Sequence, residues 1–183
     1  MHRLLPTVLI AAILVAPASQ SSAQTPPVAD GSMIEWPTFT QALEEAKKNG
    51  KIVAIDVFSD TCQWCRKLQT EIYTVKELQT YVFENFQLGR INIDFTDDEI
   101  TYKGYTLSSS QLGAGFGATG TPTTIFLEPD GDYITRLPGF HGYDEFFEVL
   151  RFIGTESFRE MSFTEYSKQN ESPEQPGGKS SQE

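Results

Sequence analysis

The two cysteines of the chain, Cys62 and Cys65, are separated by only two residues and directly follow the apolar run 52–58. This order predicts a strand that leads into a helix carrying both thiols. Thiols three positions apart on a helical turn can close a disulfide without moving the backbone, and the first lies where the helix N-terminus favours a thiolate. The thiolate is the attacking species in thiol–disulfide exchange. The pair therefore predicts redox chemistry, because a structural disulfide closing so short a loop would remove little unfolded-chain entropy.

Metal binding is the other chemistry that two neighbouring thiols suggest. A closed zinc site needs four ligands. Beyond residue 23, however, the chain offers the two thiols and one histidine, His141. We therefore expect no metal and no cofactor beyond the Cys62–Cys65 disulfide, although the two thiolates, with His141, could carry copper(I). The match of 115–120 to G-x-G-x-x-G leads into a strand and opens no helix, so no dinucleotide site is expected.

The start of the chain has the three-part layout of a secretory signal peptide. A short basic start is followed by an apolar stretch over 4–15 and by small polar residues up to Ala23, so we expect a signal peptide over 1–23. The apolar stretch is shorter than the roughly 20 residues that span a bilayer. In an oxidising compartment cysteines usually become permanent disulfides. A single pair of closely spaced cysteines is more typical of a catalytic pair that alternates between disulfide and dithiol. The net charge of −11 argues against nucleic acids and anionic membranes as partners.

Hydrophobic periodicity predicts one α/β domain over 32–164, between a flexible leader over 24–31 and a disordered tail over 165–183. Helices are expected over 37–49, from an N-cap at Asp60 or Thr61 to Tyr73, and over 74–85, 108–118 and 143–153. Strands are expected over 51–58, 86–93 and 122–127, and a hairpin turn over 129–132 returns the chain antiparallel over 133–137. Residues 95–120 form an insertion with a short extended excursion over 100–107.

The order of these elements and three local landmarks resemble the thioredoxin superfamily. Asp56 precedes Cys62 by six positions, Gly120-Thr121-Pro122-Thr123 is similar to the loop that carries a cis proline, and 136–140 resembles the loop that borders the substrate groove. The resemblance implies a central mixed sheet flanked by helices, with an insertion before the cis-proline loop. The run 138–143 is similar to exported bacterial thioredoxins, including the periplasmic thioredoxin found with sulfur-oxidation systems.

The resemblance also implies a role for each cysteine and for the acid behind them. Cys62 would be the more exposed nucleophile, and Cys65 would resolve the mixed disulfide. Asp56 would be buried, with a raised pKa, and would take a proton from Cys65. Arg90 aligns with a lysine that neighbours this acid in thioredoxins, so it would either pair with Asp56 or lie at the surface.

Four further residues are expected to contact the substrate. The resemblance implies that the cis geometry of Pro122 exposes the neighbouring backbone of Thr121 to an extended substrate. Gly139 lies in the loop that borders the substrate groove. Trp64 stands between the cysteines, where the superfamily more often carries proline, histidine or tyrosine. It would either contact an apolar substrate surface or pack over the rim of the site.

These features together lead us to expect a monomeric periplasmic thiol–disulfide oxidoreductase. It would reduce disulfides of exported proteins or sulfur-carrier thiols and be kept reduced by a membrane thiol carrier. The same residues leave three alternatives open: an oxidase that installs disulfides, a copper(I) metallochaperone that uses both thiolates, and a binding module whose disulfide is permanent.

Overall fold

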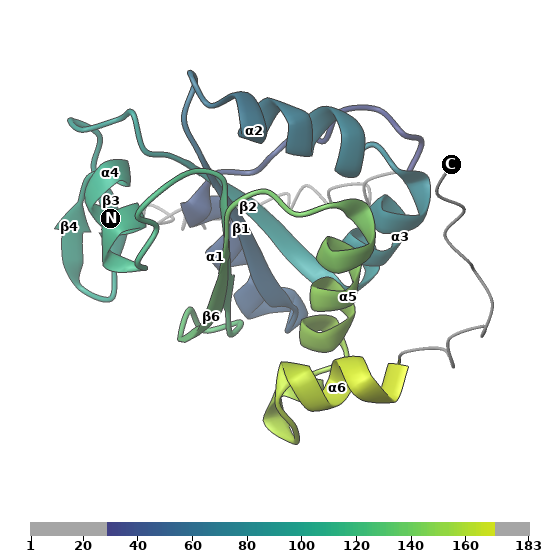
Figure 1. Cartoon of the computed structure of the whole chain (residues 1–183). Helices are drawn as coiled ribbons and strands as arrows, with labels where there is room; N and C mark the ends of the chain where they lie inside the picture. Colours follow the sequence, from purple (N-terminus) through teal and green to yellow (C-terminus); the bar gives the residue numbers. More distant parts are fainter. Residues whose placement is uncertain (1–28, 171–183) are drawn as a thin grey trace, which may run out of the picture.

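The main sheet has the strand order β2-β1-β5-β6 (Figure 1). The computed structural model describes residues 29–170. Strands β1 and β2 are parallel, whereas β5 is antiparallel to both β1 and β6. The strand bounds are Ile52–Phe58 for β1, Phe86–Asn92 for β2, Thr123–Leu127 for β5 and Tyr133–Pro138 for β6. The mixed sheet expected from the sequence is therefore confirmed.

Helices cover both faces of this sheet (Figure 1). One apolar core lies between the sheet and helices α1 and α4, and a second lies between the sheet and helices α3 and α5. A short helix, α2, continues into a π-helical segment, η1, above the second core. The helical bounds are Phe39–Asn49 for α1, Gln63–Lys67 for α2, Leu68–Ile72 for η1, Lys76–Asn85 for α3, Ser109–Gly115 for α4 and Tyr143–Gly154 for α5.

Strand β1 is central, and its side chains alternate between the two cores. Val53, Ile55 and Val57 are fully buried against α1 and α4. Ile52 and Ala54 face the core under α3 and α5, and the period of two places Asp56 on that same side. A continuous apolar run is what a strand covered on both faces requires. One carboxylate is thereby placed inside an otherwise apolar layer.

Helix α1 begins two residues later than the sequence predicted. Thr38 is its N-cap, and its hydroxyl accepts from the N–H of Gln41 while the Gln41 side chain accepts from the N–H of Thr38. This capping box satisfies two N–H groups at once. Pro37 stays outside the helix, and its carbonyl accepts from the N–H of Arg90 at 3.0 Å.

The insertion expected before β5 is present, and its extended part is a hairpin that is followed by a helix. Strands β3 (Ile100–Tyr102) and β4 (Tyr105–Leu107) pair antiparallel, and α4 follows directly. The hydroxyl of Tyr102 donates to the carbonyl of Gly131 at 2.6 Å. The insertion is therefore held to the turn between β5 and β6.

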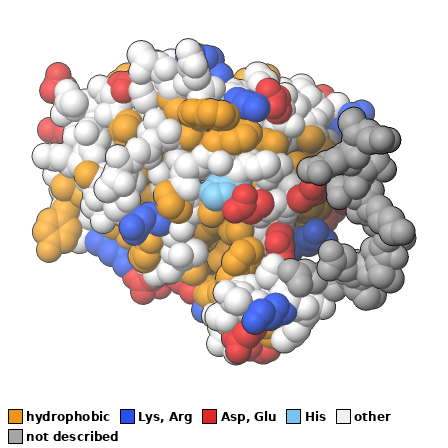
Figure 2. All heavy atoms as spheres, viewed as in Figure 1, with side chains coloured by type: hydrophobic (Ala, Val, Ile, Leu, Met, Phe, Trp, Pro, Cys, Tyr) orange, Lys and Arg blue, Asp and Glu red, His pale blue; other side chains and the backbone are white. Residues whose placement is uncertain are grey.

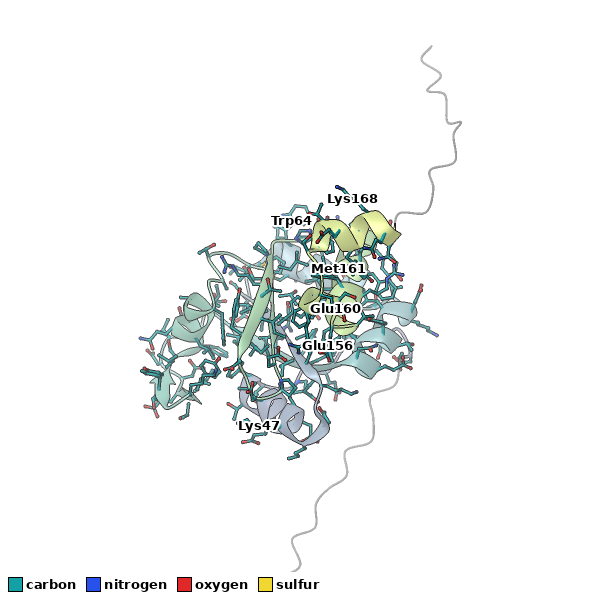
Figure 3. The ribbon with its side chains drawn as sticks, turned by 90° about the horizontal axis from the view of Figure 1, so that it is seen from below. Lys47, Trp64, Glu156, Glu160, Met161 and Lys168 are labelled. Atoms are coloured by element: carbon teal, nitrogen blue, oxygen red, sulfur yellow. A yellow bond between two sulfur atoms is a disulfide. The ribbon has the colours of Figure 1, made fainter. Side chains whose placement is uncertain are left out.

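The structure corrects one predicted boundary of the domain, at its C-terminal end. Helix α6 (Phe163–Asn170) occupies the first residues of the expected tail, so the prediction of disorder was wrong for residues 165–170. The rings of Phe163 and Tyr166 lie 5.4 and 5.2 Å from that of Phe152, and this aromatic packing orders a segment of otherwise polar composition. In Figure 3 the helix that carries Lys168 lies against the rest of the domain. Gly31, expected in a flexible leader, donates its N–H to Gln79 at 2.9 Å.

The remaining predictions about the two ends concern residues that the structure does not describe. The expected signal peptide over 1–23 lies outside the described residues, and so do 24–28 of the leader and 171–183 of the tail. Between residues 29 and 170, no helix has the length and apolar character needed to cross a membrane.

The close approach of β2 to α1 generates a stability prediction. A Cβ on Gly89 would lie 2.5 Å from Cβ of Ala42 and 2.7 Å from Cδ1 of Ile55. We expect Gly89→Ala to lower the free energy of unfolding by about 1–3 kcal/mol, because overpacking a dense core displaces its side chains. Gly115→Ala, whose added methyl group meets nothing within 4 Å, is the control. Urea unfolding measures the stability of both variants. Equal stability of Gly89→Ala and Gly115→Ala would contradict this account of the packing between β2 and α1.

Candidate active site

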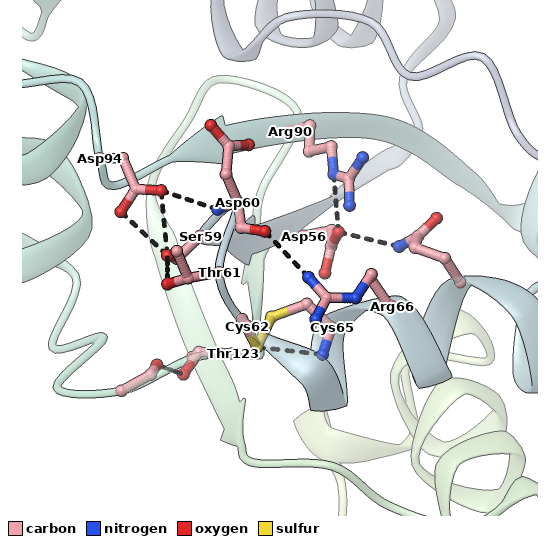
Figure 4. Close-up of a disulfide and its surroundings, with 12 residues drawn as sticks. Asp56, Ser59, Asp60, Thr61, Cys62, Cys65, Arg66, Arg90, Asp94 and Thr123 are labelled. Carbon is pink, nitrogen blue, oxygen red and sulfur yellow. Dashed lines mark hydrogen bonds and ion pairs between the residues drawn. A yellow bond between two sulfur atoms is a disulfide. The ribbon is translucent and has the colours of Figure 1, made fainter.

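Cys62 and Cys65 are joined as a disulfide at the start of α2, with their Cα atoms 5.3 Å apart (Figure 4). Cys62 is the N-cap of the helix, and its Sγ accepts from the N–H of Cys65 at 3.0 Å. Cys62 is partly exposed, whereas Cys65 is 2% exposed. The two sulfur atoms therefore differ in access, since a substrate in solution can reach only the first.

The capping of α2 corrects the expectation that Asp60 or Thr61 caps this helix. The carboxylate of Asp60 instead accepts from the side-chain amide of Asn92 at 3.0 Å, and its N–H donates to the carboxylate of Asp94 at 2.7 Å. The bond between Asp60 and Asp94 is drawn in Figure 4, and the two bonds together fix the loop before α2 to the end of β2 and the residues that follow it. The sulfur of Cys62 is left as the cap, a role that residue preferences assign to oxygen side chains.

The environment of Cys62 favours negative charge on its sulfur. The first turn of α2 contains no acidic residue, and Arg66 and Lys67 lie in its last turn. A backbone N–H already points at the sulfur, and free N–H groups at a helix N-terminus carry partial positive charge. After reduction, this arrangement stabilises a thiolate at the exposed position.

Asp56 lies inside the protein behind the cysteine pair (Figure 4). Its side chain is fully buried, and its Oδ2 accepts from Nε2 of Gln69 at 3.0 Å and from Nε of Arg90 at 2.9 Å. Its Oδ1 is buried and accepts no hydrogen bond from the described residues. Burial raises the pKa of Asp56 to about 6, and the Arg90 guanidinium opposes that rise. The acid is thus placed where it can exchange a proton near neutral pH.

Arg90 forms the ion pair that was one of the two alternatives for it. Asp56 and Arg90 are register partners on the parallel strands β1 and β2, so their side chains leave the sheet side by side. The guanidinium also lies 3.6 Å from the ring centre of Phe58, and the side chain is 23% exposed. It therefore partly neutralises the acid while its outer part reaches solvent.

The loops that carry Pro122 and Gly139 are tied together. The Thr121–Pro122 peptide bond is cis, and the carbonyl of Pro122 accepts from the N–H of Gly139 at 2.8 Å. Gly139 has φ of 87°, a conformation that glycine adopts without strain. Thr123, at the start of β5, is among the residues around the disulfide in Figure 4. Pro122 is buried, whereas Thr121 is partly exposed and Gly139 is exposed.

Trp64 packs over the rim of the site, which was one of the two alternatives considered for it. It is 56% exposed, and its ring lies 5.2 Å from that of Phe140. The ammonium of Lys67 lies 5.3 Å from the Trp64 ring and 5.1 Å from the Phe140 ring. Figure 2 shows apolar side chains gathered over α2, with positive charge next to them. Trp64 thus packs on the rim and still presents apolar surface beside Cys62.

Two buried neighbours of Asp56 were missed by the sequence analysis. Gln69 lies four residues after Cys65, so both project from the same side of the helical segment, and a lone amide on that buried side was the available signal. Tyr73 is also buried, and its pKa is raised by burial and by the charge of Asp56. His141, considered as a copper ligand, contacts the Pro138 carbonyl and the Glu145 carboxylate through its two ring nitrogens.

Comparisons with known proteins place this site in a family. Residues 39–154 match the model of the thioredoxin-like domain. The disulfide bond reductase DsbH of Chlamydia pneumoniae is 27% identical over 115 residues, which are 62% of this chain and 68% of that protein.

Two solved structures share the fold. A thioredoxin-fold protein from Helicobacter pylori is 25% identical, with a TM-score of 0.54 over 66% of this chain and 80% of its own. A thioredoxin from Thermus thermophilus is 23% identical, with a TM-score of 0.53 over 67% and 88%. The chain therefore belongs to the thioredoxin-like family and, with its Cys62–Cys65 pair, is a thiol–disulfide oxidoreductase.

Proposed function

We propose that this protein reduces disulfides in the periplasm, acting on exported proteins or on sulfur-carrier thiols. The observation that carries the proposal is the asymmetric cysteine pair, with an exposed sulfur at a helix N-terminus and a buried one in front of a buried acid. The similarity to a protein named as a disulfide bond reductase supports the direction of the reaction. The layout of residues 1–23 supports export.

The reaction proceeds through two exchanges of sulfur–sulfur bonds. The Cys62 thiolate attacks one sulfur of the substrate disulfide, a mixed disulfide forms, and the other substrate sulfur leaves with the bonding electron pair. The Cys65 sulfur then attacks Cys62, which forms the Cys62–Cys65 disulfide and releases the second substrate sulfur. Two electrons pass from the enzyme to the substrate, whose two sulfurs leave as thiols.

Asp56 supplies the proton acceptor for the second exchange. Cys65 is buried, so its thiol is a poor nucleophile until a base removes its proton. The pKa of about 6 at Asp56 leaves the carboxylate mostly charged at neutral pH, and the proton passes to it directly or through one water molecule.

The exposed surface around Cys62 would hold the substrate. Backbone of Thr121, next to Pro122, and the exposed Gly139 flank the path of an extended chain, and Trp64 adds apolar contact area. A membrane thiol carrier would return the Cys62–Cys65 disulfide to the dithiol form. We further propose that the protein acts as a monomer and needs no bound cofactor.

Single serine substitutions separate the two exchanges. Cys62→Ser should abolish reduction of a fluorescent disulfide-linked peptide, because the attacking thiolate is gone. Cys65→Ser should carry out the first exchange only and accumulate a mixed disulfide with the peptide. Mass spectrometry under non-reducing conditions detects this adduct. A Cys62→Ser variant that reduces the peptide at the wild-type rate would overturn the mechanism.

The buried acid should impose a pH dependence on stability. The pKa of Asp56 is about 6 in the folded protein and near 3.8 when unfolded, so the folded state binds the proton more tightly and stability falls as pH rises between these values. The loss is on the order of 3 kcal/mol. Asp56→Asn should remove this slope.

Denaturant unfolding of the oxidised protein from pH 4 to pH 8 measures the slope. Asp97→Asn, which removes an exposed acid, is the control and should keep the wild-type curve. An unchanged slope in Asp56→Asn would show that the Asp56 carboxylate does not titrate in this range.

A further inference from the structure

The Asp56 carboxylate is held through only one of its two oxygens. Gln69 and Arg90 both donate to Oδ2, at 3.0 and 2.9 Å. Oδ1 is equally buried and has no hydrogen-bond partner among residues 29–170. A buried carboxylate oxygen without a partner is costly, so such an atom calls for an explanation.

The orientation of the Gln69 amide is set by Trp36. The indole N–H of Trp36 donates to Oε1 of Gln69 at 2.9 Å. An indole nitrogen can only donate, so it must face the amide oxygen, and the NH₂ group is thereby turned toward Asp56. The edge-to-face contact of Trp36 with Tyr73, at 4.9 Å, fixes the indole in turn. Gln69 is 4% exposed, so no solvent competes for its amide.

We propose that Gln69, oriented by Trp36, is a positioning residue for proton transfer at Asp56. By donating to Oδ2 it stabilises the charged carboxylate and keeps Oδ1 free as the acceptor for the Cys65 proton. The proposal rests on the redox function proposed above. It assigns a role to two residues outside the Cys-x-x-Cys motif and the cis-proline loop.

The proton accounting of the second exchange shows what this arrangement achieves. The Cys65 proton moves to Oδ1 as its sulfur forms the bond to Cys62, and the bond between Cys62 and the substrate breaks. The substrate sulfur leaves with the electron pair and is protonated by solvent, and Asp56 later returns its proton to solvent. Gln69 donates throughout, but its bond is stronger to the charged carboxylate than to the neutral acid. It thus favours the state that is ready to accept a proton.

The other groups around Asp56 cannot replace Gln69 in this role. Arg90 faces it from β2, and Tyr73 faces it from the end of η1. Cys62 and Cys65 face it from α2, and its antiparallel register partner on β5, Thr124, is uncharged. Arg90 carries the opposite charge and already donates to Oδ2, so replacing it would remove the charge that neutralises Asp56 together with a hydrogen bond. Of the two described side chains that donate to the Asp56 carboxylate, Gln69 is the neutral one, so its removal tests hydrogen bonding apart from charge.

The test compares Gln69→Met, Trp36→Phe and the double variant. The titration of the Asp56 carboxyl carbon is followed by NMR in the oxidised protein, where neither cysteine titrates. Without the Gln69 donor the charged form loses a hydrogen bond, so the midpoint should rise by about one pH unit in Gln69→Met. Trp36→Phe should shift it in the same direction by less, because the amide is then free to rotate. The double variant should match Gln69→Met alone.

A matched control is available on α3. Gln79 is 1% exposed, and its amide also makes two hydrogen bonds, to Ser32 and Gly31. Gln79→Met should therefore lower stability without moving the Asp56 titration. The rate of resolution of a mixed disulfide can also be measured in a single turnover as a function of pH. The pH at which this rate rises should be higher in Gln69→Met than in the wild type, and unchanged in Gln79→Met.

An unchanged Asp56 midpoint in Gln69→Met would overturn the proposal, and so would a Trp36→Phe shift that adds in full to it. Trp36→Phe retains both donors to Asp56, so it gives the same test if Gln69→Met does not fold. The titration needs no turnover. A protein without reductase activity but with the shifted midpoint would refute the proposed function and leave the role of Gln69 intact.

Discussion

The ion pair of Asp56 and Arg90, formed across two parallel strands, is the constraint on which the rest of the site depends. A bare carboxylate in the layer between β1 and the helices would not stay ionised, because burial disfavours charge. The guanidinium, 2.9 Å away, keeps the pKa of Asp56 at about 6 instead of higher. The register of β1 on β2 places the two side chains next to each other, so the pairing of the strands keeps the pKa of Asp56 close to neutral pH.

The asymmetry of the cysteine pair arises from the same side of the fold. The loop before α2 is fixed to the end of β2, and this places Cys62 at the helix N-terminus and Cys65 beneath it. The exposed sulfur accepts from the backbone N–H of Cys65 at the helix N-terminus, and this position favours a thiolate. The buried sulfur lies in front of the Asp56 carboxylate, which is the acceptor proposed for its proton. The surroundings thus make one sulfur exposed and the other buried, as the proposed attacking and resolving roles require, although the two side chains are identical.

Much of this arrangement could be predicted from the sequence because it depends on local pattern. The apolar run of β1, the spacing of the cysteines and the turn after β5 gave the sheet, the redox pair and the family. The sulfur cap at Cys62 and the amide of Gln69 depend on which donors the folded chain leaves unpaired, and a single sequence does not show this. Helix α6 is ordered by its contact with Phe152. Phe152 lies outside the segment whose polar composition suggested disorder.

The reduction potential of the Cys62–Cys65 pair tests most directly whether this protein is a reductase. The purified domain would be equilibrated with glutathione or dithiothreitol buffers and the fraction of dithiol determined by thiol alkylation and mass spectrometry. A reductase should have a potential near that of thioredoxin, about −270 mV. A potential near that of strongly oxidising disulfide donors, about −120 mV, would contradict the account and reverse the direction of the reaction.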